Sequence, residues 1–200
     1  MKNIVTTAFV FATIIGTVLA APQTGQPAPE FTLTDSNGKS HKLSDFKGKF
    51  VVLEWLNHGC PFVVKHYGSG NMQRLQKEYT GKDVVWLSIA SSASGKQGHM
   101  SPEETNKTKE EKGSSATAVL LDEDGTVGKL YDAKVTPELY VINPEGVLVY
   151  AGAIDDKKST DPADVAGAKN YVKQALDEAM AGKPVSEPTI TAYGCGIKYN

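Results

Sequence analysis

The stretch FVVLEWLNHGCPF, residues 50–62, carries the strongest indication of the fold. Its first part, Phe50–Leu53, is a short apolar run rich in β-branched residues, which is typical of a buried strand. Pro61 suits the first turn of a helix, where the N–H that proline lacks would have no partner. Cys60 is therefore predicted to lie between a strand and the N-terminus of a helix.

This position favours a reactive cysteine. The unpaired N–H groups and the dipole at a helix N-terminus stabilise a thiolate, which is the nucleophilic form of the side chain. The alternative is an inert buried cysteine, which is common in protein cores. The polar neighbours Asn57, His58 and Gly59 argue against that alternative. We therefore predict redox or nucleophilic chemistry at Cys60.

Strands and helices alternate along the rest of the chain. A hairpin is predicted at residues 31–43, and further strands at 50–55, 84–90, 118–121, 139–142 and 147–152. Helices are predicted at 60–80 with an interruption at 68–71, at 101–112, at 127–131 and at 162–181. This order indicates an α/β sandwich with its reactive groups beyond the carboxyl ends of the strands.

Residues 1–20 have the pattern of a signal peptide. Lys2 provides the positive end, Ile4–Leu19 the apolar stretch, and Ala20 a small residue before the cleavage point. An uncleaved membrane anchor is the less favoured alternative. We expect an exported protein, periplasmic or secreted, with no stable membrane anchor. Residues 21–184 would form one domain, and residues 185–200 a C-terminal tail without a strong regular pattern.

Composition narrows the functional class. The net charge is −2, and Arg74 is the only arginine, so the clustered basic residues of a nucleic-acid surface are missing. The chain has two cysteines, Cys60 and Cys195. In an exported protein, two cysteines are the expected number for one disulfide.

Together these features resemble the thioredoxin superfamily, in its redoxin or peroxiredoxin-like branch (the alkyl hydroperoxide reductase/thiol-specific antioxidant type). The resemblance is carried by the strand–Cys60–Pro61–helix junction, by Thr136–Pro137 before a strand, by the turns at 122–125 and 143–146, and by YGCGIKY at 193–199. It implies a thioredoxin-like sandwich, in which a central mixed sheet is flanked by helices and extended by an N-terminal β-hairpin. It also implies a cis proline at Pro137, packed beside the reactive cysteine.

The chain departs from both branches of that superfamily. Val63 stands where thioredoxins have the second cysteine of Cys-x-x-Cys. Leu53 and Asn57 stand where peroxiredoxins have the proline and threonine that precede their cysteine, and Arg74 lies too far along the helical region to match their peroxide-binding arginine. Peroxidase activity is therefore a hypothesis beside disulfide reduction.

Four more residues are candidates for the site. Glu54 has the sequence offset of the buried acid of thioredoxins and would act as a general base with a raised pKa, unless it points outward. His58 would support the thiolate as a cationic or hydrogen-bonding imidazole, unless it is an exposed loop residue. The resemblance implies that the edge at Thr136 and Pro137 pairs with the backbone of a redox partner. His66 is expected to be a surface or packing residue.

The sequence thus predicts a cofactor-free, exported thiol oxidoreductase. Cys60 would attack a peroxide or a protein disulfide, Cys195 would resolve the intermediate, and a thioredoxin-like dithiol would restore the reduced protein. Two alternatives remain at this point. One is a copper-binding module that uses both cysteines with His58 or His66. The other is a redox-inert domain with a structural Cys60–Cys195 disulfide.

Overall fold

The computed structural model describes residues 21–200, so the predicted signal peptide lies outside the described residues. The strands are β1 Thr32–Asp35, β2 Ser40–Lys42, β3 Val51–Trp55, β4 Val85–Ala90, β5 Ala118–Leu121, β6 Val135–Thr136, β7 Glu138–Ile142, β8 Leu148–Gly152, β9 Thr189–Ile190 and β10 Cys195–Gly196. The α-helices are α1 Pro61–Gly68, α2 Asn71–Thr80, α3 Pro102–Glu111, α4 Thr126–Leu130 and α5 Tyr171–Met180, with 3-10 helices η1 Leu43–Phe46 and η2 Pro162–Gly167.

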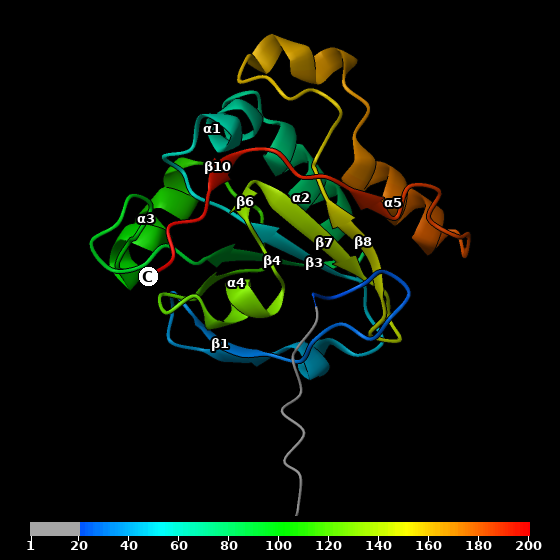
Figure 1. Ribbon diagram of the computed structural model, residues 1–200, viewed down its shortest axis with the longest axis horizontal. Helices are drawn as coiled ribbons and strands as arrows, with labels where there is room; N and C mark the ends of the chain where they lie inside the picture. The colour runs from blue at the N-terminus through cyan, green and yellow to red at the C-terminus, as the bar shows by residue number, and fades with distance from the viewer. Residues whose placement is uncertain (1–20) are drawn as a thin grey trace, which may run out of the picture.

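Eight strands form one mixed sheet in the order β2-β1-β5-β4-β3-β7-β8-β9. β3, β4 and β5 are parallel, whereas β7 is antiparallel to β3 and β8 is antiparallel to β7. Every residue of β3 and β4 is buried, as expected for central strands covered on both faces. The α/β class, the central mixed sheet and the N-terminal hairpin of β1 and β2 are confirmed (Figure 1).

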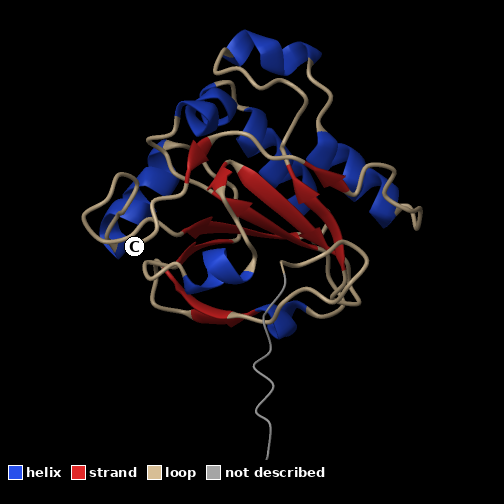
Figure 2. Cartoon of the chain, viewed as in Figure 1, coloured by secondary structure: helices blue, strands red, loops and turns tan. Residues whose placement is uncertain are grey.

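Two hydrophobic clusters pack on the two faces of this sheet. Helices α1, α2 and α5 cover one face, and α4 and η1 cover the other (Figure 2). Successive residues of a strand point to opposite faces. Val52 therefore belongs to the cluster under α1 and α2, while Leu53 and Trp55 belong to the other. Glu54, which alternates with them, points toward α1 and α2.

The predicted start of α3 and the predicted interruption after α1 are confirmed. The Ser101 side chain accepts from the backbone N–H of Glu104, whose carboxylate accepts from the Ser101 N–H, which is a capping box. Between α1 and α2, Gly70 has φ 71°. Glycine tolerates this left-handed conformation because it has no Cβ. The chain can therefore turn there and begin a new helix.

The prediction of one helix over 162–181 is wrong. The structure has the 3-10 helix η2, then extended backbone at Ala168, and α5 begins only at Tyr171. The Asn170 side chain accepts from the backbone N–H of Lys173 and caps α5. The local hydrogen bonding of asparagine ends the helical pattern, and the buried residues of α5 are Val172, Ala175 and Leu176.

The tail after residue 184 is more regular than its sequence suggests. β9 adds to β8 in parallel at one edge of the main sheet, and β10 pairs with β6 in a separate two-stranded sheet. At Gly152 a Cβ would lie 1.7 Å from the Ile190 carbonyl oxygen, so only glycine admits β9 this closely. In residues 21–200, no helix combines the length and the apolar character that crossing a membrane would require.

Candidate active site

Cys60 occupies the N-cap of α1, as its sequence context predicts. Its backbone is extended, with φ −83° and ψ 124°, and its carbonyl accepts from the Val64 N–H at 2.9 Å. Asn57 shapes the approach to the helix: its carbonyl accepts from the Cys60 N–H and its side-chain oxygen from the Gly59 N–H, both at 2.9 Å. The Cys60 side chain is 0 % exposed. The loop between β3 and α1 thus places a buried thiol over the first turn of the helix.

The segment before β7 lies against this thiol. The Thr136–Pro137 peptide bond is cis, as predicted. Cys60 Sγ donates to the Thr136 carbonyl oxygen at 3.0 Å. The Thr136 side-chain hydroxyl is buried and has no hydrogen-bond partner within residues 21–200. Thr136 therefore presents both its carbonyl and a spare hydroxyl on the side of the fold where Cys60 lies.

Cys195 reaches the same place from the tail. It lies directly opposite Thr136 in the antiparallel β6–β10 pair. Its side chain is half-buried and packs against the hydrophobic cluster that contains Cys60. Both cysteines are free thiols in this structure. The two predicted partners are thus brought together by β10, whereas Val63 is buried inside α1.

The two thiols affect each other's acidity in opposite directions. Burial raises the pKa of Cys60, but hydrogen bonds to its thiolate outweigh burial and lower that pKa below its usual range. The Cys195 thiol is the strongest of these donors, and the backbone N–H groups of Val63 and Cys195 add to it. Burial, together with the hydrogen bond and the charge of Cys60, raises the pKa of Cys195 to about 11. Cys60 is the better thiolate of the pair.

Glu54 is buried, which excludes the outward-pointing alternative. Its carboxylate accepts four hydrogen bonds: from Trp86 Nε1 at 2.7 Å, Ser88 Oγ and the Tyr67 hydroxyl at 2.9 Å each, and Gln76 Nε2 at 3.0 Å. Burial raises the pKa of Glu54 more than these donors lower it. The raised pKa has the predicted direction, but every one of these partners comes from α1, α2 or β4, and none is a cysteine.

His58 does not supply a cation. Burial, aided by the positive charge of Lys112, lowers the pKa of His58 to about 4, so the imidazole is neutral at neutral pH. Its ring packs edge-on against Tyr67, with 4.8 Å between centroids. The cationic alternative for His58 is therefore wrong, because the half-buried position disfavours the protonated form. The other alternative, a hydrogen-bonding imidazole that supports the thiolate, stays a prediction.

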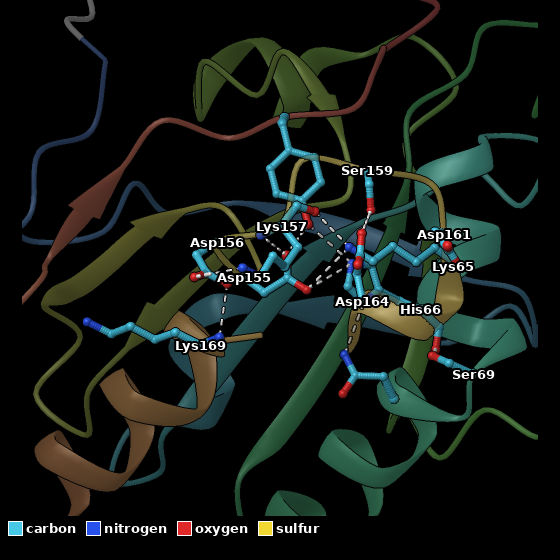
Figure 3. A network of polar contacts seen from close by, with 12 residues as sticks. Lys65, His66, Ser69, Asp155, Asp156, Lys157, Ser159, Asp161, Asp164 and Lys169 are labelled. Carbon is cyan, nitrogen blue, oxygen red and sulfur yellow. Dashed lines mark hydrogen bonds and ion pairs between the residues drawn. The ribbon is translucent and has the colours of Figure 1, made fainter. Parts of the chain in front are cut away.

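A buried polar cluster beside the site escaped the sequence analysis. Lys65 and His66 of α1 and Asp155, which follows β8, are all nearly inaccessible to solvent, and Figure 3 shows their side chains directed toward one another. Tyr193 of the tail donates to Asp155. His66, expected to be a surface or packing residue, is 0 % exposed and hydrogen-bonded. Neither the Lys65–His66 pair nor the Asp155–Asp156 pair belongs to a periodic sequence pattern that could reveal their contact.

The copper-site alternative requires a third ligand beside the cysteines. Among residues 21–200, no group of three or more His, Cys, Asp or Glu side chains is arranged to hold a metal ion. His58 packs on Tyr67, and His66 Nδ1 lies 3.0 Å from Asn71 Nδ2. The structure therefore does not bring either histidine together with the two cysteines.

One protein family and two relatives from Bacillus subtilis are similar to this chain in sequence. The family model described as AhpC/TSA family matches residues 24–151, more than half of the chain. The thiol-disulfide oxidoreductase ResA of Bacillus subtilis is 31% identical over 140 residues, which cover 68% of this chain and 73% of the relative. The thioredoxin-like protein YneN of the same organism is 28% identical over 147 residues, covering 72% and 80% of the two chains.

Solved structures share the fold over most of the chain. An uncharacterized conserved protein from Geobacillus kaustophilus has a TM-score of 0.77 at 32% identity, covering 89% of this chain and 93% of its own. A hypothetical protein from Sinorhizobium meliloti has a TM-score of 0.75 at 24% identity, covering 90% and 97%. The thioredoxin domain of a thiol-disulfide oxidoreductase from Bacteroides vulgatus has a TM-score of 0.52 at 23% identity, covering 74% and 97%. The fold is thioredoxin-like, as predicted.

Proposed function

Because the chain belongs to the AhpC/TSA family of thioredoxin-like redoxins, we propose that it is a thiol oxidoreductase with Cys60 as nucleophile and Cys195 as resolving thiol. One observation carries this proposal: β10 places the thiol of Cys195 at the N-cap of α1, where Cys60 has a lowered pKa. A low pKa makes Cys60 the attacking group at neutral pH. Cys195, with its pKa raised to about 11, remains a protonated thiol until the second step.

With a disulfide substrate, the Cys60 thiolate attacks one sulfur and releases the other as a thiolate. The resulting mixed disulfide is opened when Cys195, having lost its proton, attacks Cys60 Sγ and expels the second substrate thiolate. The substrate is reduced by two electrons and the protein holds a Cys60–Cys195 disulfide. An external thioredoxin-like dithiol returns the protein to its reduced state. No cofactor takes part in these steps.

With a hydroperoxide, the first step differs. The Cys60 thiolate attacks the O–O bond, releases the alcohol and becomes a sulfenic acid. Cys195 then condenses with that sulfenic acid and water leaves.

We favour disulfides as the main substrate, because the residues at the positions of the peroxiredoxin proline and threonine make other contacts here. Leu53 packs on the opposite face of the sheet from Cys60. The Asn57 side chain accepts from the Gly59 N–H and donates to Gln97.

Substrate access requires movement of the tail. Cys60 is 0 % exposed, and the segment carrying the half-buried Cys195 packs against it. A substrate sulfur therefore reaches Cys60 only after this segment shifts, and its return places Cys195 beside the mixed disulfide. The pattern of residues 1–20 supports export to the periplasm or the medium, where disulfide substrates persist.

The experiment is a pair of single-turnover reactions with the fully reduced protein. One uses a small aromatic disulfide, the other hydrogen peroxide, and each is followed by rapid quenching and intact mass spectrometry. The expected product is a protein lighter by two hydrogen atoms, formed faster with the disulfide. Cys60→Ser should give no such product with either substrate. If the wild-type protein forms no Cys60–Cys195 disulfide, the proposed function is wrong.

A reduction potential separates this function from the structural-disulfide alternative. A structural disulfide has a potential below about −300 mV and resists reduction by cellular thiols. A catalytic one has a higher potential and is reduced by a thioredoxin-like dithiol. We expect the higher potential, because hydrogen bonds that stabilise the Cys60 thiolate favour the reduced form of the pair.

A further inference from the structure

A buried anchor holds the tail at Tyr193, two residues before Cys195. The Tyr193 hydroxyl donates to Asp155 Oδ1. Asp155 Oδ2 lies 3.5 Å from Lys65 Nζ, and this ammonium also donates to the Lys157 carbonyl at 2.7 Å. His66 Nε2 lies 3.4 Å from the Tyr193 hydroxyl. We call the side chains of Tyr193, Asp155, Lys65 and His66 the tail anchor; Figure 3 labels Asp155, Lys65 and His66.

The tail anchor is electrically balanced inside the protein. Lys65 and Asp155 are 1 % and 2 % exposed and carry opposite charges. Burial, which outweighs the attraction of Asp155, lowers the pKa of His66 to about 4, so His66 is neutral at neutral pH. Burying a charged pair is costly unless additional hydrogen bonds satisfy it. The Tyr193 hydroxyl provides one of those bonds, which gives the tail a specific place to dock.

Tyr193 of the tail anchor lies close to both cysteines in the structure. The Tyr193 ring packs edge-on against Phe62, with 5.6 Å between centroids, and Phe62 lies two residues after Cys60. Between Tyr193 and Cys195, Gly194 has φ 151°, and a Cβ there would lie 2.0 Å from the Thr136 carbonyl oxygen. That same oxygen accepts the hydrogen bond of Cys60 Sγ. The backbone next to Cys195 is thus fixed directly over the atom that holds Cys60.

From this geometry we propose that Tyr193 is a positioning residue for the Cys60–Cys195 reaction. Its hydroxyl docks the tail on Asp155 and so raises the effective concentration of the Cys195 thiol at Cys60 Sγ. Tyr193 neither gains nor loses a proton in the step. The substrate thiolate that leaves takes up the proton that Cys195 loses, so the step balances without an acid or base from Tyr193. This inference rests on that proposed function, since it assigns Tyr193 a part in its second step.

The decisive variant is Tyr193→Phe, which keeps the ring on Phe62 and removes only the hydroxyl. Its matched control is Tyr199→Phe, because the Tyr199 hydroxyl is also in the tail and also donates a hydrogen bond, in this case to the backbone carbonyl of Ala133 at 2.8 Å. The measurement is the equilibrium constant of the Cys60–Cys195 disulfide against a glutathione buffer, together with the rate at which Cys195 resolves a preformed mixed disulfide on Cys60.

We expect Tyr193→Phe to lower both the equilibrium constant and the resolution rate about tenfold, which raises the potential by about 30 mV. Tyr199→Phe should change either quantity less than threefold. A purely structural role of Tyr193 would lower the melting temperature without moving the potential. An equilibrium constant and a resolution rate within twofold of wild type in folded Tyr193→Phe would overturn the proposal.

Gly194→Ala is a second, independent variant, because its Cβ would push the tail away from Thr136 while leaving the tail anchor intact. We expect Gly194→Ala, like Tyr193→Phe, to lower the equilibrium constant of the disulfide and the resolution rate. If Gly194→Ala keeps the wild-type equilibrium constant, tail placement does not control the disulfide, and the proposal fails whatever Tyr193→Phe does. If instead wild-type protein forms no disulfide at all, it is the proposed function that fails.

Discussion

Cys195 and Thr136 are directly opposed in the antiparallel pairing of β10 with β6. Thioredoxins, which this chain resembles, hold their second cysteine in the helix, where α1 here has Val63. In this protein the second thiol comes instead from a strand of the C-terminal tail. Because a strand edge can separate from its neighbour without unfolding a helix, the two thiols can part and meet again while α1 stays intact.

The acidity of Cys60 should depend on a donor at position 195. We expect the alkylation rate of Cys60, followed by mass spectrometry of its peptide, to show an inflection below the value of about 8.5 for a free thiol. Cys195→Ala removes the thiol that donates to the Cys60 thiolate and should raise that inflection. Cys195→Ser keeps an O–H donor and should leave it close to wild type. Equal inflections in the two variants would contradict the assignment of this donor.

Cys195→Ser should trap the intermediate. Without a resolving thiol, a disulfide substrate leaves Cys60 as a stable mixed disulfide, and peroxide leaves it as a sulfenic acid that a dimedone probe captures. The measurement is the mass added to the Cys60 peptide after one equivalent of substrate. Wild-type protein treated in the same way should carry no adduct. Multiple turnovers by Cys195→Ser at the wild-type rate would show that another group resolves Cys60.

Glu54 should titrate above 4.5, the value from which burial raises its pKa. A carboxyl group with a raised pKa in the folded state stabilises the fold fully below the unfolded pKa, and that contribution is lost as the pH rises through the folded pKa. The carboxyl ¹³C shift of Glu54 against pH measures the midpoint. Glu54→Gln should cost about 1–3 kcal/mol, because its amide N–H₂ would face donors such as Trp86 Nε1.

The partly exposed acid Glu78 provides the control for that substitution. It forms ion pairs with Lys82 and Lys173 at the surface. Surface ion pairs contribute at most about 1 kcal/mol. We therefore expect Glu78→Gln to change the free energy of unfolding less than Glu54→Gln does. A Glu54 midpoint at or below 4.5 would show that its four donors dominate over burial.

His58→Phe should flatten the acid side of the stability curve. The folded-state pKa of His58 is lowered from 6.5 to about 4, so between these values the unfolded chain binds more protons than the native one. Stability therefore falls as the pH drops from about 6.5 toward 4. Phenylalanine removes the titration and keeps the edge-on contact with Tyr67. Urea unfolding across this range should show a shallower slope in the variant, by at most about 1.4 kcal/mol per pH unit. Identical slopes would refute a neutral, buried His58.

The sequence predicted the parts of this molecule that depend on local patterns. β3 and the start of α1 follow from an apolar run and from Pro61, and the break between α1 and α2 follows from the glycines at 68 and 70. The cis Thr136–Pro137 bond followed from a family resemblance. The break before α5 was missed, because Asn170 serves as a cap only if the preceding residues leave the helical conformation.

Other features depend on contacts between distant segments. The tail anchor joins α1, the loop after β8 and the tail, and none of these segments contains a motif that identifies the others. The charge state of His58 depends on its burial against Tyr67, which the loop sequence alone does not reveal. The strands β9 and β10 have two residues each and form only because β8 and β6 offer them free edges.

The distance along the chain between Cys60 and β10 has a consequence for biosynthesis. The ribosome makes Cys60 long before it makes Cys195, so a growing chain carries the nucleophile before its partner exists. A nascent or prematurely terminated chain that lacks β10 would therefore hold a helix-capping thiol with nothing to resolve it. Such fragments would accumulate as adducts with other thiols rather than as a harmless internal disulfide.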